Sequence, residues 1–140
     1  MMGGIEIMAN DLLITNCSLL SGPDGVIGHR SFVEIGAGRI TAIGPMSSFP
    51  ERAKGTVIDA AGKLLLPGLV NAHNHCAMTL FRGLADDLEL AAWLNEHIFP
   101  AEAAHVNPEM VYWCTLLAAA EMIRSGTTTV ADGYFFSGQA

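Results

Sequence analysis

Charged residues are scarce in this chain of 140 residues: they make up 15% of it, where about 25% is usual, while hydrophobic residues make up 51%. Intrinsic disorder needs the opposite balance, so a folded chain is expected. Long apolar runs are also missing, since none approaches the ~18 residues of a membrane-spanning helix. We therefore expect a folded protein with no place in a membrane.

Cysteine and basic residues are rare as well. Cys17, Cys76 and Cys114 are an odd number at irregular spacing, and the first ten residues carry no basic cluster ahead of an apolar stretch. This pattern favours free thiols in the cytoplasm over a secreted disulfide framework. Seven Lys and Arg against fourteen Asp and Glu give a net charge of −7. Because nucleic-acid binding needs a concentrated basic surface, this charge counts against that class, and we expect no nucleic-acid partner.

Residues 11–62 show the sequence pattern of short strands and turns. Apolar and polar residues alternate at 39–43, as in a half-buried strand, and glycine-rich segments at 21–25 and 36–38 resemble turns. The pattern predicts a small β-meander, with its last strand at 56–59.

After Gly62 the pattern changes to that of an α/β unit. Residues 63–70 are almost continuously apolar, as in a strand buried on both faces, with a break at Pro67-Gly68. A helix is predicted at 87–99, with Asp87 as its N-cap and Pro100 just beyond its end.

A second helix is predicted at 107–125, with Asn107 as its N-cap and Gly126 as its C-terminal glycine. A β-branched strand at 127–131 then completes a strand–helix–strand crossover. The apolar stripe expected to face the core consists of Met110, Cys114, Leu117, Ala118 and Ile123.

His73 and His75 stand one residue apart at the end of the buried strand. Side chains at i and i+2 of a strand project from the same face, and ligands gather at the carboxyl ends of strands in α/β sheets. Imidazole is a common ligand of zinc, iron and nickel. An isolated H-x-H pair is more often a surface pair, but the buried strand before it and the crossover after it favour half of a metal site.

The sequence LPGLVNAHNH at residues 66–75 resembles the first barrel strand of the amidohydrolase superfamily. It is most similar to the branch that holds the S-adenosylhomocysteine and methylthioadenosine deaminases and the triazine chlorohydrolases. The likeness continues through residues 77–88, 93–94, 100–102, 121–122, 126–129 and 132, and residues 11–62 resemble the N-terminal segment of the family.

The resemblance implies a (β/α)8 barrel with a small β-sandwich built from both chain ends. Residues 1–62 would supply sandwich strands and residues 63–140 the first βα units of an incomplete barrel. It also implies that His73 and His75 are the first two ligands of one divalent metal ion, zinc or iron. Trp93 and Glu102 match positions that contact the base of the substrate.

The implied activity is deamination of an aminopurine or pyrimidine-type heterocycle by a metal-bound hydroxide. A barrel takes about 250 residues, so this chain would be the N-terminal part of the enzyme and inactive by itself. The remaining ligands and the general base come from later strands in the family, so no catalytic residue is expected within this chain. Exposed apolar faces predict a homo-oligomer or another association.

Alternative interpretations remain open at this point. The same chemistry could dechlorinate a triazine, or the chain could be a non-catalytic assembly module. A nuclease of the H-N-H type is disfavoured, since the letters His73-Asn74-His75 lack a ββα-metal context and a basic surface. Trp93 could be a core residue and Glu102 a solvated loop residue.

Other polar residues are interpreted as structural. Arg82 is expected to pair with Asp86 or Asp87, one of which would also cap a helix. Asp132 is considered as a support for the metal ligands. No metal role is expected for His29, His97 or His105, and Cys76 has no base partner that would make it a nucleophile.

Overall fold

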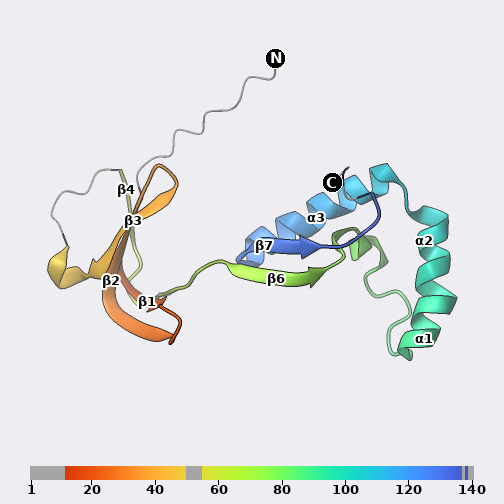
Figure 1. Cartoon of the computed structure of the whole chain (residues 1–140), viewed down its shortest axis with the longest axis horizontal. Helices are drawn as coiled ribbons and strands as arrows, with labels where there is room; N and C mark the ends of the chain where they lie inside the picture. The colour runs from red at the N-terminus through yellow and green to blue at the C-terminus, as the bar shows by residue number, and fades with distance from the viewer. Residues whose placement is uncertain (1–11, 50–54, 137, 139–140) are drawn as a thin grey trace, which may run out of the picture. The chain divides into compact units, whose positions relative to one another are not determined.

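The computed structural model describes residues 12–49, 55–136 and 138, and the chain divides into two compact units, Met1–Pro67 and Gly68–Ala140 (Figure 1). The division falls after Pro67, later than the predicted change after Gly62. None of the helices within the described ranges is both long enough and apolar enough to cross a membrane.

A five-stranded sheet forms the first unit. β1 (Leu12–Ser21), β2 (Val26–Gly36) and β3 (Arg39–Pro45) pair in antiparallel order, whereas β4 (Thr56–Asp59) and β5 (Leu64–Leu65) both pair with β1 in parallel. The predicted meander is confirmed for three strands and wrong for the last one, which lies beside the first strand. The continuous strand predicted at 63–70 is also wrong, because its first part belongs to this sheet.

One face of the first sheet carries its core. Leu13, Thr15, Cys17 and Leu19 alternate along β1 and are buried, as the period of two in a strand requires. Cys17 and Leu19 pack with Val33 of β2. The β-sandwich, in which a second sheet would pack against this one, stays a prediction.

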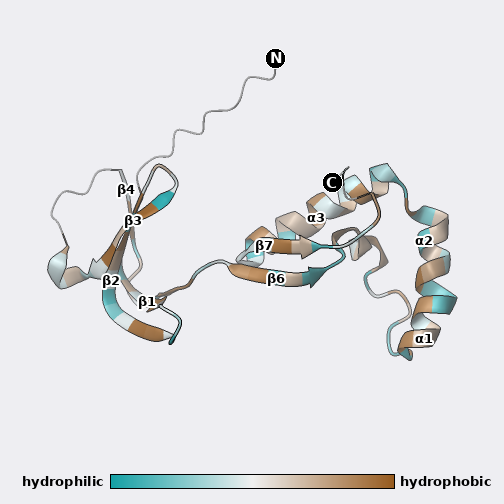
Figure 2. Ribbon diagram, in the orientation of Figure 1, coloured by the Kyte–Doolittle hydropathy of each residue, from teal (hydrophilic) through white to brown (hydrophobic). Residues whose placement is uncertain are grey.

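The second unit is built on a parallel pair of strands. β6 (Leu69–Asn74) lies beside β7 (Thr127–Asp132), and the connection contains the 3-10 helix η2 (Cys76–Phe81) and a series of further helices. The predicted strand–helix–strand crossover is thus confirmed (Figure 1). Figure 2 shows that both strands are hydrophilic at their carboxyl ends, so polar groups converge at one edge of the pair.

The helix α3 (Pro108–Ser125) has the predicted ends. Oδ1 of Asn107 accepts a hydrogen bond from the backbone N–H of Met110 at 2.9 Å, and Gly126 adopts φ 89° after the last turn. The predicted core stripe is only partly correct. Val111 and Ala118 are buried, whereas Leu117 and Ile123 of that stripe are exposed.

The helix predicted at 87–99 begins later and runs further. Asp87 adopts φ 66° in a turn and caps nothing, and α1 (Leu90–Ala92) leads into the π-helical segment η3 (Trp93–Ile98) and then α2 (Phe99–His105). The backbone N–H of Phe99 donates to the carbonyl of Leu94, five residues back. This wide turn shifts the hydrogen-bond register just before Pro100, so the helix continues through a residue that usually ends one.

The break at Pro67-Gly68 has a packing reason. A Cβ on Gly68 would lie 2.7 Å from Cβ of Thr128 on β7 and nearer still to its Oγ1 and Cγ2. The chain therefore enters β6 so close to β7 that only glycine fits there.

Candidate functional site

The two histidines singled out from the sequence lie together at the carboxyl end of β6. His73 is inside the strand and His75 follows it directly, and their ring centroids are 5.2 Å apart with planes at 72°. Both residues are exposed. The structure therefore brings two imidazoles to one edge of the β6–β7 pair.

The orientation of His75 is set by the residue that follows β7. Its Nδ1 lies 2.6 Å from the carbonyl oxygen of Gly133. Because a carbonyl only accepts hydrogen bonds, Nδ1 is the donor in this contact, and in the neutral imidazole Nε2 then presents a lone pair. A backbone or carboxylate acceptor on the far nitrogen is the usual support of a metal-binding imidazole.

Asp132 fastens the two strand ends to each other. Its Oδ1 accepts the backbone N–H of Cys76 at 2.7 Å, and the N–H of Gly133 donates to the carbonyl of Asn74 at 3.1 Å. Asp132 thus acts on the backbone next to His75. Burial raises the pKa of the Cys76 thiol, and the Asp132 carboxylate adds to this shift. The thiol therefore stays protonated, which makes Cys76 a poor nucleophile.

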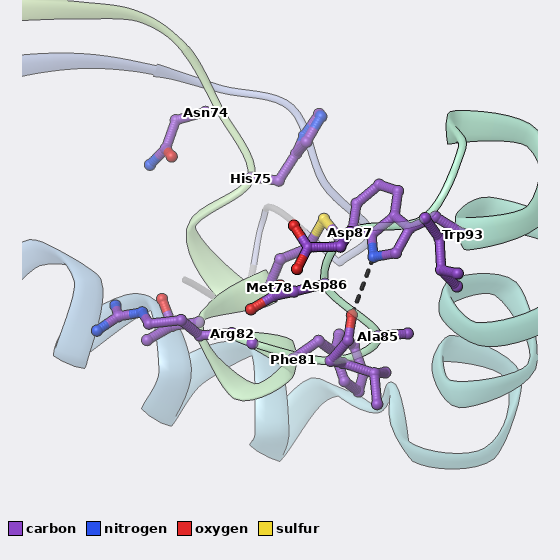
Figure 3. Close-up of a pocket in the computed structure, with 13 residues that line it drawn as sticks. Asn74, His75, Met78, Phe81, Arg82, Ala85, Asp86, Asp87 and Trp93 are labelled. Atoms are coloured by element: carbon purple, nitrogen blue, oxygen red, sulfur yellow. Dashed lines mark hydrogen bonds between the residues drawn. The ribbon is translucent and has the colours of Figure 1, made fainter.

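Trp93 lines a cavity of about 480 Å³ that also contains His75 (Figure 3). The indole Nε1–H of Trp93 donates to the carbonyl of Leu84 at 3.0 Å. Since this is the only polar hydrogen of the side chain, the ring faces are what Trp93 offers to a ligand. The same bond fixes the loop that forms the floor of the cavity.

Glu102 lies on α2 and not in a loop as predicted. It borders a second cavity of about 490 Å³, which is lined by His75, Glu102, Gly133, Tyr134 and Phe135. The Tyr134 hydroxyl donates to Oε1 of Glu102 at 2.8 Å. His75 lines both cavities, whereas Trp93 and Glu102 border different ones.

Arg82 has a different partner from the predicted one. Its guanidinium forms two hydrogen bonds with the carboxylate of Glu121 on α3, at 3.1 and 2.6 Å, and does not pair with Asp86 or Asp87. In Figure 3 its side chain points away from His75 and Trp93. The pair connects the cavity loop to α3 and lowers the pKa of the Glu121 carboxyl through hydrogen bonding and charge.

This ion pair predicts a pH-dependent difference in stability. A lowered carboxyl pKa means that the pair stabilises the fold above the unfolded pKa of Glu121 and loses this effect as the pH falls through the folded value. The unfolding midpoints of wild type and Arg82→Gln should differ at neutral pH and converge on acidification. Arg124→Gln is the control, since Arg124 makes no ion pair within the described ranges, and a constant gap between wild type and Arg82→Gln would contradict the prediction.

The other histidines belong to other elements. His29 of the first unit contacts the hydroxyl of Ser18 at 3.1 Å through Nδ1, and His97 and His105 lie on η3 and α2. Among the described residues, no three His, Cys, Asp or Glu side chains gather as a metal site would require. No local signal in the sequence singles out Gly133 and Tyr134, because only the pairing of β7 with β6 brings them to His75.

His73 and His75 lie at the end of a parallel strand, and His75 lines two cavities. This arrangement makes the strand end a candidate metal-binding site on an α/β unit. Residues 64–138, more than half of the chain, match the amidohydrolase family. The chain therefore belongs to the amidohydrolase family, and the resemblance noted from residues 66–75 is confirmed.

Curated relatives are deaminases of adenosine-type nucleosides by name. A 5-methylthioadenosine/S-adenosylhomocysteine deaminase of Syntrophobacter fumaroxidans is 52% identical over 128 residues, covering 90% of this chain and 29% of the relative. A 5'-deoxyadenosine deaminase of Methanosarcina mazei is 52% identical over 127 residues, covering 90% of this chain and 28% of that protein. The chain thus spans less than a third of the length of these relatives.

Solved structures show the same fold. An adenosine deaminase from Xanthomonas campestris with bound zinc superposes with a TM-score of 0.87 at 42% identity, covering 93% of this chain and 30% of that one. An atrazine chlorohydrolase from Arthrobacter aurescens complexed with zinc gives a TM-score of 0.76 at 22% identity, covering 86% and 28%. At that identity the second likeness concerns the fold alone.

Proposed function

We propose that this chain is the N-terminal part of a cytoplasmic, metal-dependent amidohydrolase that deaminates an aminopurine or pyrimidine-type heterocycle. The observation that carries the proposal is the His73–His75 pair, in which the bond from His75 to Gly133 leaves Nε2 available. The names of relatives that are 52% identical support the substrate class.

The proposal extends to the fold of the whole enzyme. β6 and β7 are the first two strands of a (β/α)8 barrel, with residues 63–140 as its first βα units. Residues 1–62 supply strands of a β-sandwich that other parts of the protein complete. In such barrels the site lies at the carboxyl ends of the strands, which is where His73 and His75 are found.

The residues present fit a divalent cation, zinc or iron(II). Neutral imidazole nitrogens suit both metals, and His73 and His75 would hold the ion together with ligands from later strands. When bound, such a cation lowers the pKa of water, so that a nucleophile is available at neutral pH. Gly133 and Asp132 keep the strand ends in register and hold His75 in the tautomer that binds metal.

Substrate positioning falls to Trp93 and Glu102. The Trp93 indole offers its ring face in the cavity shared with His75, because its N–H is occupied by Leu84. An aromatic heterocycle can stack on such a face. The Glu102 carboxylate accepts a hydrogen bond from a ring N–H of the substrate.

The role of Glu102 is tested by Glu102→Gln in the full-length protein. The amide keeps the size of the side chain but loses its charge, and hydrogen bonds to charged groups contribute roughly 1.5–3 kcal/mol. We expect kcat/KM to fall about ten- to a hundredfold, a range that follows from about 1.4 kcal/mol per factor of ten, with metal content unchanged. The assay is ammonia release from a panel of aminopurines and aminopyrimidines, beside elemental analysis.

Glu96→Gln is the matched control, because Glu96 is an exposed residue of the preceding helical segment and borders neither cavity. Full activity of Glu102→Gln on every substrate would make Glu102 a solvated residue. Loss of metal in the same variant would instead assign it to support of the metal ligands.

We further propose that the protein associates through its apolar surfaces. Trp113, Leu116 and Leu117 on α3 expose 61%, 45% and 51% of their surfaces. Patches of this kind become buried against other protein surfaces. No specific observation favours triazine dechlorination, since the chlorohydrolase likeness concerns the fold alone.

A further inference from the structure

The segment that follows β7 touches both halves of the candidate site. The carbonyl of Gly133 holds Nδ1 of His75 at 2.6 Å, and the hydroxyl of the next residue, Tyr134, holds Oε1 of Glu102 at 2.8 Å. The Tyr134 ring also lies near the His75 ring, with centroids 6.2 Å apart. One dipeptide thus connects the proposed metal ligand to the proposed substrate contact.

The bond from Tyr134 constrains a side chain that is otherwise mobile. A glutamate side chain loses rotamer entropy when it is ordered, so a fixed orientation needs a partner. In the described part of the chain, Tyr134 is the side chain that bonds the Glu102 carboxylate, and it occupies Oε1 and leaves Oε2 free to accept. Both residues border the cavity that contains His75.

Tyr134 is suited to a permanent donor role. Burial raises the pKa of its hydroxyl, and the neighbouring Glu102 carboxylate raises it further. The phenol therefore stays protonated at neutral pH.

We propose that Tyr134 is a positioning residue that holds one oxygen of Glu102 and so directs the other toward the substrate. This inference rests on the proposed function, because it needs Glu102 to contact the substrate. Tyr134 does not itself touch the reacting atoms. Its contribution is to order the carboxylate before the substrate arrives, and preorganised contacts lower the cost of binding.

The test is Tyr134→Phe in the full-length protein, which removes the hydroxyl and keeps the ring. We expect KM for the best heterocyclic amine to rise about tenfold, in line with one hydrogen bond to a charged group, while kcat stays within about twofold. Tyr112→Phe is the matched control, since Tyr112 is the only other tyrosine in the chain and is exposed on α3. It should leave both constants unchanged.

The same substitution in a Glu102→Ala background separates a positioning role from a direct one. Tyr134→Phe should then cause no further change, because residues that act through one another are not additive. An unchanged KM in the single variant, or an equal rise in the Glu102→Ala background, overturns the proposal.

A full-length protein that releases ammonia from no amine would reject the proposed function instead. In that case the unfolding midpoints of Tyr134→Phe, Glu102→Ala and the double variant still decide whether Tyr134 holds Glu102. Non-additive shifts support the contact, and additive shifts overturn it.

Discussion

Replacing His73 or His75 with Ala in the full-length protein is expected to remove the proposed metal ion and the proposed deaminase activity together. Each change deletes one of the two imidazoles that meet at the end of β6, and a catalytic zinc site normally has three protein ligands. Without the ion, water keeps its ordinary pKa and no nucleophile forms at neutral pH. Turnover should fall to the uncatalysed background, and elemental analysis should show less than stoichiometric metal.

His105→Ala is the matched control, because His105 is an exposed histidine on α2 and borders neither cavity. It should keep full metal content and full activity. A His75→Ala protein that retained one tightly held ion per chain would show that His75 is not a ligand.

Gly68→Ala is expected to destabilise the protein more than any surface substitution described above. The new methyl group would overlap Thr128, and the two strands would have to move apart where β6 begins. Overpacking of this kind costs about 1–3 kcal/mol. The measurement is the unfolding midpoint of the full-length protein in denaturant.

Two further variants isolate the cause. Gly138→Ala should have little effect, because a Cβ at Gly138 meets no atom within 4 Å. Thr128→Ala, which removes the two atoms that would lie nearest the new methyl group, should recover part of the stability lost by Gly68→Ala. If it recovered none, the close approach of the two strands would not be the reason for the glycine.

The elements predicted correctly are those with strong local signals. Asn107 and Gly126 mark the ends of α3 by their side-chain and backbone chemistry, which act within one helical turn. The apolar run that ends in His73 and His75 likewise predicted the strand end at which the two histidines lie. These features depend on neighbours in sequence, so a single chain reveals them.

The features that could not be predicted depend on contacts distant in sequence. The partner of Arg82 lies on α3, the parallel placement of β4 depends on β1, and the contact of Tyr134 with Glu102 forms only after β7 lies beside β6. The predicted helix end before Pro100 was wrong for another reason. A proline usually ends a helix because it has no backbone N–H to donate. Here the π-helical turn before Pro100 shifts the hydrogen-bond register, so the helix continues.

The π-helical turn in η3 also affects the directions in which the side chains before and after it point around the helix axis. A π turn holds one residue more than an α turn, so it amounts to a one-residue insertion, and each residue of an α-helix advances about 100° around the axis. Trp93 begins the segment and Glu102 comes after it. Removing one residue from it would rotate Glu102 by about a quarter turn relative to Trp93. The extra residue therefore sets the angle around the helix axis between Trp93 and Glu102. These two residues border different cavities, and His75 lines both of them.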